Sequence, residues 1–258
     1  MTKKQMTDIQ RRTWLRTTAG AGAGLSTFAA LGTMLQACGG SAHASTLEHD
    51  DNGFPAFFAQ APVLRIQDPL AAFLGAVTDG IMEYRYVDAV RLAGHSCPTV
   101  AGAYLMTLKG ITALYGASLA QRGDIEVFMR DGADEGVTGV IAAVATLLTG
   151  AASATGFAGM GPAGRFSRKN LLQFSTPMSG VMALRRRDNG EAVQLAINHE
   201  LTPGAEEMAD LMPKAVAGKA TPEELQRFAA LWQERVKRMV VDHAGDERLV
   251  KVSAWAPN

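Results

Sequence analysis

Apolar side chains recur at intervals of three and four residues in several segments of the chain, a pattern typical of amphipathic helices. Asp68-Pro69 marks one helix start, because aspartate can accept the free amide hydrogens of a first turn and proline fits its first position. Further helices are expected over about 87–92, from Pro98 to about residue 119, and over 137–148. The apolar face expected for the first helix consists of Leu70, Phe73, Leu74 and Val77.

Two helices are expected to close the domain, and the last has the clearest boundaries. Thr221 and Glu224 form a capping box around Pro222, so the helix should begin there. Its expected buried stripe consists of Leu225, Phe228, Ala229, Trp232, Val236 and Met239.

Alternation of apolar and polar residues predicts strands between the helices. It occurs at 125–129, at 171–174 and near the C-terminus at 249–252. The segments 179–187 and 191–199 flank Asp188-Asn189-Gly190, a strong hairpin signal. The order of elements predicts a single α+β domain with a mixed or antiparallel sheet packed by helices.

Charge is unevenly distributed, although the 258 residues have a formal net charge of zero. Residues 1–37 contain five basic side chains and one acidic side chain, so they carry +4 and the remainder carries −4. A mildly acidic domain lacks the basic surface that binds nucleic acid, so that class of function is excluded. With 47% hydrophobic residues, the chain is long enough to bury a core.

The basic N-terminus resembles a twin-arginine (Tat) export signal. Arg11 and Arg12 are followed by Trp14, Leu15 and Arg16, and then by an uncharged, weakly hydrophobic stretch that ends at residue 37. We therefore expect residues 1–37 to be a Tat signal segment and the domain to work on the extracytoplasmic side, in the periplasm.

Two processing sites are compatible with this signal. The sequence around Cys38 resembles a lipobox, in which Cys38 would become an acylated first residue and anchor the domain to a membrane. Alternatively, Ala42-His43-Ala44 fits an ordinary signal-peptidase site. Both alternatives leave residues 38–62 as a linker and residues 63–258 as the folded domain.

His95 and Cys97 are the strongest candidates for chemistry. Side chains two positions apart in an extended loop point the same way, so both could reach one ligand. Pro98 would place Cys97 at a helix N-cap, where free amides favour the thiolate that binds metal or attacks an electrophile. The pair suits zinc, with nickel or iron as alternatives. A buried structural cysteine beside a surface histidine is the other interpretation.

His199 is the expected third metal ligand. It follows Val193, Leu195 and Ile197 at strand spacing and would share their face, although a hydrogen-bonded filler role is also compatible with this position.

A cluster of basic residues follows the glycine-rich stretch 150–164. Arg165, Arg168 and Lys169 could bind an anion or belong to a solvated loop.

The segment 86–98, which includes Gly94-His95-Ser96-Cys97-Pro98, resembles the signature region of the FmdE-like family, which takes its name from a component of formylmethanofuran dehydrogenase. Looser similarity continues over 124–200, where Leu148-Thr149-Gly150 and Lys169-Asn170-Leu171 resemble two further family segments. The resemblance implies an α+β core, often dimeric, with a metal near the motif histidine and cysteine.

The chain also departs from the family pattern. Ala93 and Thr99 stand where many members have histidine and glycine, and Val140 lies near the position of a further cysteine. The C-terminal zinc finger of some members is absent from this sequence. Methanofuran chemistry therefore cannot be transferred from the family name.

The sequence thus predicts an exported FmdE-like domain that binds a divalent metal and handles a metal or cofactor, or supports a periplasmic redox system. Two alternatives stay open. In the first, the domain is an enzyme in which Cys97 is a nucleophile and His95 its base, acting on a small electrophile. In the second, it is a non-catalytic module that binds a small organic ligand, and Cys97 is structural.

Overall fold

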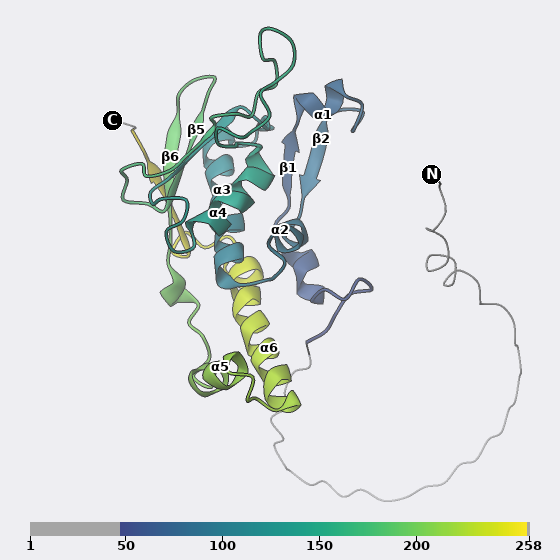
Figure 1. The fold of residues 1–258 in the computed structure, drawn as a ribbon, viewed down its shortest axis with the longest axis vertical. Coiled ribbons are helices and arrows are strands. Elements are labelled where there is room, and N and C mark those ends of the chain that lie inside the picture. The colour runs from purple at the N-terminus through teal and green to yellow at the C-terminus, as the bar shows by residue number, and fades with distance from the viewer. Residues whose placement is uncertain (1–46, 257–258) are drawn as a thin grey trace, which may run out of the picture. The chain divides into compact units, whose positions relative to one another are not determined.

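A five-stranded mixed sheet and the long helix α3 (Pro98–Tyr115) lie at the centre of the computed structural model, which describes residues 47–256 (Figure 1). β3 pairs in parallel with β4, and the other neighbouring strands are antiparallel. The predicted hairpin around Asp188-Asn189-Gly190 is confirmed. In spatial order the strands are β4 (Leu172–Gln173), β3 (Ile125–Met129), β5 (Met182–Arg186), β6 (Ala192–Ile197) and β7 (Val250–Ala254).

Helix α3 packs closely on this sheet because two of its residues have no side chain. A Cβ on Gly102 would lie 2.6 Å from Ile197 Cδ1, and a Cβ on Gly110 would lie 2.6 Å from Leu184 Cδ1. α4 (Thr138–Thr149) packs on α3, and α2 (Tyr86–Ala93) contacts both helices. The sequence predicted all three helices, and α3 ends at Tyr115, a few residues earlier than expected.

A separate two-stranded sheet was not predicted. β1 (Leu64–Gln67) pairs antiparallel with β2 (Ile81–Tyr84), and the short helix α1 (Pro69–Phe73) lies between them in sequence. The expectation of a longer helix with a buried face was wrong, because the chain turns at Gly75 with a positive φ of 72°. Phe73 and Leu74 are consequently exposed, at 55% and 61%.

The folded domain begins before residue 63, earlier than the expected end of the linker. The 3-10 helix η1 (Ala56–Gln60) places Phe57 and Phe58 in the core. The Phe58 ring meets the Tyr86 ring edge to face, with their centroids 5.0 Å apart. The second half of the stretch assigned to a linker is thus part of the core.

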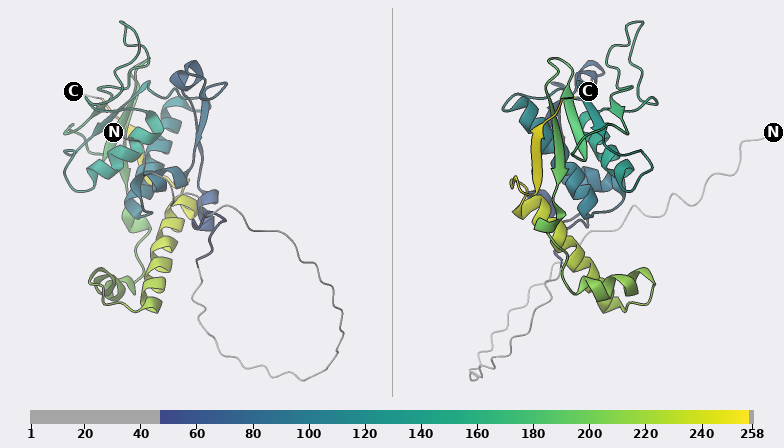
Figure 2. Two further views of the ribbon diagram at one scale, coloured as in Figure 1. Left: turned by 45° about the vertical axis from the view of Figure 1, so that its right-hand side comes forward. Right: turned by 90° about the vertical axis from the view of Figure 1, so that its left-hand side faces the viewer.

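The C-terminal helices extend away from the sheet (Figures 1 and 2). α6 (Pro222–Lys237) begins at the predicted Thr221 capping box, and its last turns, with the π-helical turn η3 (Arg238–Asp242), bury Val236 and Met239. Its Phe228 and Leu231 pack with Met208 and Leu211 of α5 (Met208–Val216), but Leu225 is 46% exposed, so the predicted stripe is buried only in part.

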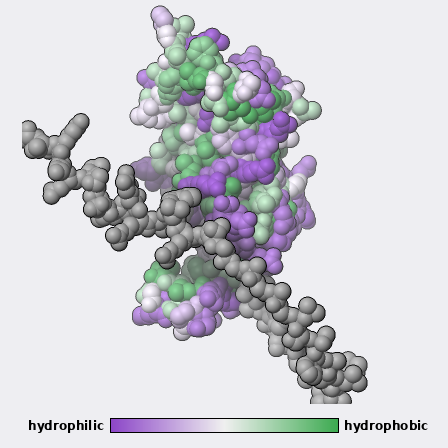
Figure 3. All heavy atoms as spheres, turned by 90° about the vertical axis from the view of Figure 1, so that its right-hand side faces the viewer, coloured by the Kyte–Doolittle hydropathy of each residue, from purple (hydrophilic) through white to green (hydrophobic). Residues whose placement is uncertain are grey.

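The helices, the two-stranded antiparallel sheet and the five-stranded mixed sheet confirm the α+β class within the described residues. Among residues 47–256, no helix has both the length and the apolar character needed to cross a bilayer. Apolar residues are exposed at the end of the domain formed by α1 and the loop 150–170 (Figure 3), and they include Phe73, Leu74, Phe157 and Met160.

Candidate functional site

The loop between α2 and α3 carries the predicted histidine and cysteine. α2 ends at Gly94, which adopts a positive φ of 75°, and Pro98 is the first residue of α3. Cys97 is the N-cap of α3, and its Sγ accepts the Val100 amide hydrogen at 3.5 Å. The predicted position of Cys97 at a helix start is therefore confirmed.

The side chains of His95 and Cys97 lie in different environments. His95 is exposed, and its Nδ1 lies 2.9 Å from the Ala93 carbonyl oxygen. Cys97 is 7% exposed and belongs to the hydrophobic core. Within the described residues no hydrogen bond joins the two side chains, so the nucleophile and base contact that the enzyme interpretation needs is not formed.

His199 lies beyond the end of β6, but its imidazole and the Ile197 side chain both approach Gly102 of α3, so it stays on the side of the sheet that the sequence predicted. The strand ends at Ile197, and the Asn198 side chain accepts the Glu200 amide, which starts the 3-10 turn η2 (His199–Leu201). The imidazole lies near Gly102 of α3, and burial, followed by the positive charge of Arg235, lowers its pKa.

These positions do not assemble the expected metal site. Across residues 47–256, no three His, Cys, Asp or Glu side chains are grouped so that they could hold one ion. His95 is exposed, Cys97 is buried in the core, and His199 lies just beyond the end of β6 beside Gly102. The set of His95, Cys97 and His199 therefore does not fit the metal centre that the family resemblance implies.

Ser96, between the two candidates, attaches the loop to α6. Its Oγ donates to Gln233 Oε1 at 2.9 Å and lies 3.0 Å from the Tyr86 hydroxyl. Its carbonyl oxygen accepts hydrogen bonds from Trp232 Nε1 at 3.0 Å and Gln233 Nε2 at 3.2 Å. No local pattern indicated this contact, because 136 and 137 residues separate its partners.

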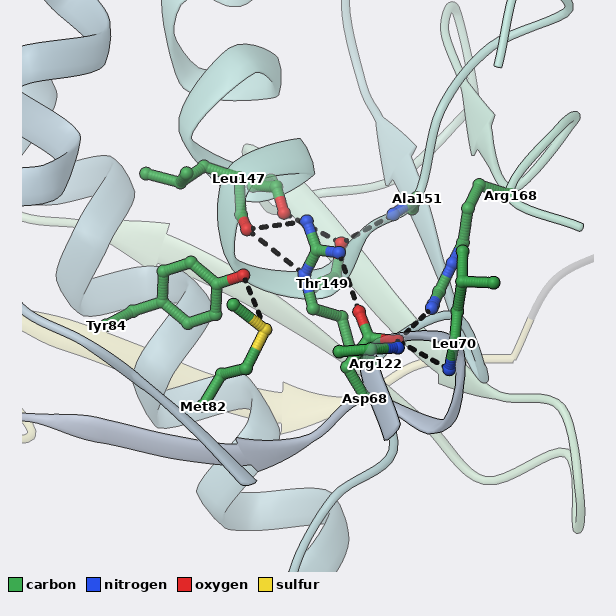
Figure 4. A network of polar contacts seen from close by, with 11 residues as sticks. Asp68, Leu70, Met82, Tyr84, Arg122, Leu147, Thr149, Ala151 and Arg168 are labelled. Carbon is green, nitrogen blue, oxygen red and sulfur yellow. Dashed lines mark hydrogen bonds and ion pairs between the residues drawn. The ribbon is translucent and has the colours of Figure 1, made fainter. Parts of the chain in front are cut away.

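A second polar centre surrounds Asp68, the predicted cap of α1 (Figure 4). Its Oδ1 accepts the Leu70 amide at 2.9 Å, as the sequence predicted, and also Arg168 Nη2 at 2.7 Å. Its Oδ2 accepts Arg122 Nη1 at 3.0 Å. Burial alone raises the pKa of this carboxyl, but the Arg122 hydrogen bond and the Arg168 charge outweigh burial and hold the pKa below its ordinary value.

Arg122 and Arg168 use their remaining groups differently. Arg122 donates from Nε and Nη2 to the Leu147 carbonyl, and its guanidinium lies over the Tyr84 ring. Arg168 is 7% exposed, and its Nη1 has no hydrogen-bond partner in the described part of the chain. A Cβ on Gly123 would lie 1.6 Å from this Nη1, so only glycine leaves room for the guanidinium.

Arg168 borders a cavity of about 350 Å³. Phe166, on the rim, has a positive φ of 65° that is unusual for a bulky side chain, and its ring centroid lies 5.3 Å from that of Phe73. The polar and charged side chains that line the cavity come from Gln121, Arg122, Asp124, Ser167, Arg168 and Arg187.

The lining of this cavity is charged, and sequence reasoning found it only in part. Arg168 was a candidate for anion binding and Asp68 a helix cap, but nothing in the sequence linked them or included Arg122. The charged residues of the lining are three arginines and Asp124, and Asp68 binds two of these arginines from outside the lining. The pairing of Asp68 with Arg122 and Arg168 joins segments that are distant in the sequence, so only the folded structure shows it.

Comparison with known proteins gives little further information. No family model matches the chain, and no curated protein matches it. One similar solved structure is a tungsten formylmethanofuran dehydrogenase FmdE-like protein from Syntrophus aciditrophicus. It has 12% sequence identity and a TM-score of 0.36, over 68% of this chain and 74% of that chain. A likeness at this TM-score carries no conclusion about the function of the present chain.

Proposed function

We propose that this domain is a binding module for a small anionic ligand, which it holds in the cavity beside Arg168. One observation carries the proposal: a guanidinium that is more than nine-tenths buried has a hydrogen-bonding nitrogen without a partner in the described part of the chain, and the residue lines a cavity. Leaving a buried charged donor unpaired costs free energy that a ligand oxygen would recover.

The surroundings of Arg168 are arranged to hold it in place. Asp68 accepts its Nη2, and Gly123 leaves space for its Nη1. Charge-assisted hydrogen bonds from a guanidinium to a carboxylate or phosphate are among the stronger polar interactions in proteins. Arginine stays protonated, so these groups suit the holding of an anion rather than the transfer of a proton.

The proposal is tested by thermal unfolding with small anions. Acetate, propionate and phosphate are added to the wild-type protein at constant ionic strength, with chloride as the reference. A ligand present at a hundred times its Kd stabilises the native state by about 2.7 kcal/mol, so the Tm should rise measurably as the anion concentration increases.

Variants separate a specific site from a general salt effect. Arg168→Lys keeps a positive charge beside Asp68 but removes the unpartnered Nη1, and it should lose most of the Tm shift. Lys169→Ala changes the exposed neighbouring residue and should respond as the wild type does. The proposal fails if no anion raises the Tm more than chloride does. It also fails if Arg168→Lys keeps the full Tm shift.

The remaining expectations from the sequence stay predictions. Export by the Tat route, membrane anchoring at Cys38 and a periplasmic redox role concern residues or partners outside the described part of the chain. Metal binding by His95 and Cys97 is likewise a prediction, and the separation of the two side chains weighs against a site built from one chain.

A further inference from the structure

We infer that the ligand of this cavity carries a positive charge as well as a negative one, and that Asp124 binds the positive group. The chemical class is a small zwitterion such as an α-amino acid. This inference rests on the proposed function and specifies its ligand.

Asp124 is a carboxylate with unused acceptors. It lines the same cavity as Arg168. Within residues 47–256, the side-chain oxygens of Asp124 accept no hydrogen bond, and their ion-pair partner is Arg187, whose Nη1 lies 3.9 Å from Oδ1. Burial, the largest influence, raises the pKa of this carboxyl, although the Arg187 charge opposes that rise.

The contrast with Asp68 defines what Asp124 lacks. The Asp68 carboxylate accepts hydrogen bonds from two guanidinium groups and from backbone amides. The cation beside Asp124 lies at a distance too long for a hydrogen bond. An ammonium group offers three donors, so it can bind the Asp124 carboxylate, whose side chain is 32% exposed.

Arg168 and Asp124 line one small cavity. Arg168 Nη1 lies 1.6 Å from the position of a Cβ on Gly123, and Asp124 is the next residue in the chain. Consecutive Cα atoms are about 3.8 Å apart, so the guanidinium and the Asp124 backbone are neighbours in the cavity. Arg168 and Asp124 both line this cavity of about 350 Å³, so a ligand that fills it and carries both charges can contact both residues.

A ligand with only a negative charge fits this arrangement less well. The arginines of the lining attract its charge, but the Asp124 carboxylate in the same cavity repels it. Pro69 and Phe166 add an apolar part to the lining, which can take an apolar side chain. The volume of about 350 Å³ lies at the lower end of the range for small-ligand sites.

The inference is tested by calorimetric titration with three compounds of one shape. Phenylalanine carries both charges, 3-phenylpropionate only the negative charge, and 2-phenylethylamine only the positive charge. We expect wild-type protein to bind phenylalanine about fivefold more tightly than 3-phenylpropionate, as one added and partly exposed ion pair allows. The amine alone should bind most weakly, because it leaves Arg168 unpaired.

The variant Asp124→Asn tests whether Asp124 causes the preference for phenylalanine over 3-phenylpropionate. In this variant phenylalanine and 3-phenylpropionate should bind equally, because the amide carries no charge. Asp242→Asn, a substitution of an exposed carboxylate outside the cavity, should keep the wild-type ratio. Circular dichroism of each variant confirms that it is folded.

The outcomes separate this inference from the proposed function. Equal wild-type affinity for phenylalanine and 3-phenylpropionate contradicts a zwitterionic ligand but not the proposed anion site. The same holds if Asp124→Asn leaves the ratio of these two affinities unchanged. If none of the three compounds binds saturably to the wild type, the proposed function is contradicted together with the inference.

Discussion

Gln233 of α6 binds the hydroxyl and the carbonyl group of Ser96: its Oε1 accepts the serine hydroxyl, and its Nε2 donates to the serine carbonyl. The loop that carries His95 and Cys97 is thus attached to a helix 137 residues farther along the chain. Trp232 adds a third hydrogen bond to the same loop. The exposure of Cys97 therefore depends on the C-terminal helix as well as on its own neighbours.

Gln233→Ala should loosen this loop. Loss of two partly buried hydrogen bonds should lower the free energy of unfolding by about 1–2 kcal/mol, measured by urea denaturation. Alkylation of Cys97 by iodoacetamide should become several-fold faster, because the thiol is otherwise buried in the core. Gln226→Ala, on the same helix but exposed, is the matched control. Equal alkylation rates in the two variants would show that Gln233 does not hold the loop.

Asp68→Asn should destabilise the domain strongly near neutral pH. The substitution removes the carboxylate that neutralises two guanidinium groups, one of them buried, and breaking one side of a buried ion pair costs about 3–5 kcal/mol. Asp51→Asn, at an exposed position, should leave the free energy of unfolding nearly unchanged. Equal stability of the two variants in urea denaturation would contradict this role for Asp68.

The lowered pKa of Asp68 also predicts that the free energy of unfolding depends on pH. The pKa of Asp68 is lower in the folded state than in the unfolded chain, so its stabilising contribution is complete above the unfolded value of about 3.9. That contribution is lost as pH falls through the lower, folded pKa. Between pH 6 and acid pH, wild type should therefore lose more stability than Asp68→Asn. Parallel stability curves for the two proteins would contradict the assignment.

Metal content tests the expectation drawn from the His-x-Cys spacing. If His95 and Cys97 bound zinc together, metal-replete protein would hold one equivalent, and His95→Ala and Cys97→Ser would lose it. Since the structure places one side chain in solvent and the other in the core, we expect less than one equivalent and no difference between variants. Elemental analysis after gel filtration measures the metal content. One equivalent of metal in the wild type that either variant loses would support the predicted metal site.

Export is tested in the full-length precursor. Replacing Arg11 and Arg12 with lysine should leave the precursor in the cytoplasm, because the arginine pair is the predicted recognition element of the signal. Cell fractionation and immunoblotting measure the distribution. Undiminished accumulation outside the cytoplasm would show that the Tat assignment is wrong.

Membrane attachment is a separate prediction. Cys38→Ala should release the exported domain into the soluble fraction if Cys38 is acylated, because the lipid would be the anchor. A protein that sediments with membranes to the same extent after this substitution would favour the other processing site, or another mode of attachment.

Local signals predicted the elements that depend on a few neighbouring residues. Pro98 after Cys97, the Thr221 capping box and the Asp188-Asn189-Gly190 turn all appear as expected. Each signal acts within about four residues, so it survives whatever the rest of the chain does.

Elements that depend on distant partners could not be predicted in this way. β1 and β2 have four residues each and are defined by pairing with each other. β6 ends before His199 because the Asn198 side chain accepts the Glu200 amide and starts a 3-10 turn, a local preference that competes with strand geometry. Arg122 and Arg168 gave no common signal, since their shared partner Asp68 lies 54 and 100 residues away.

These long separations have a consequence for how the domain folds. The Asp68 network closes two long loops, and loop closure costs entropy before the contacts begin to stabilise the chain. We expect the network to form late, after the main folding barrier. A ligand that needs the completed network then acts mainly on the unfolding rate, so it lengthens the lifetime of the folded domain without speeding its formation.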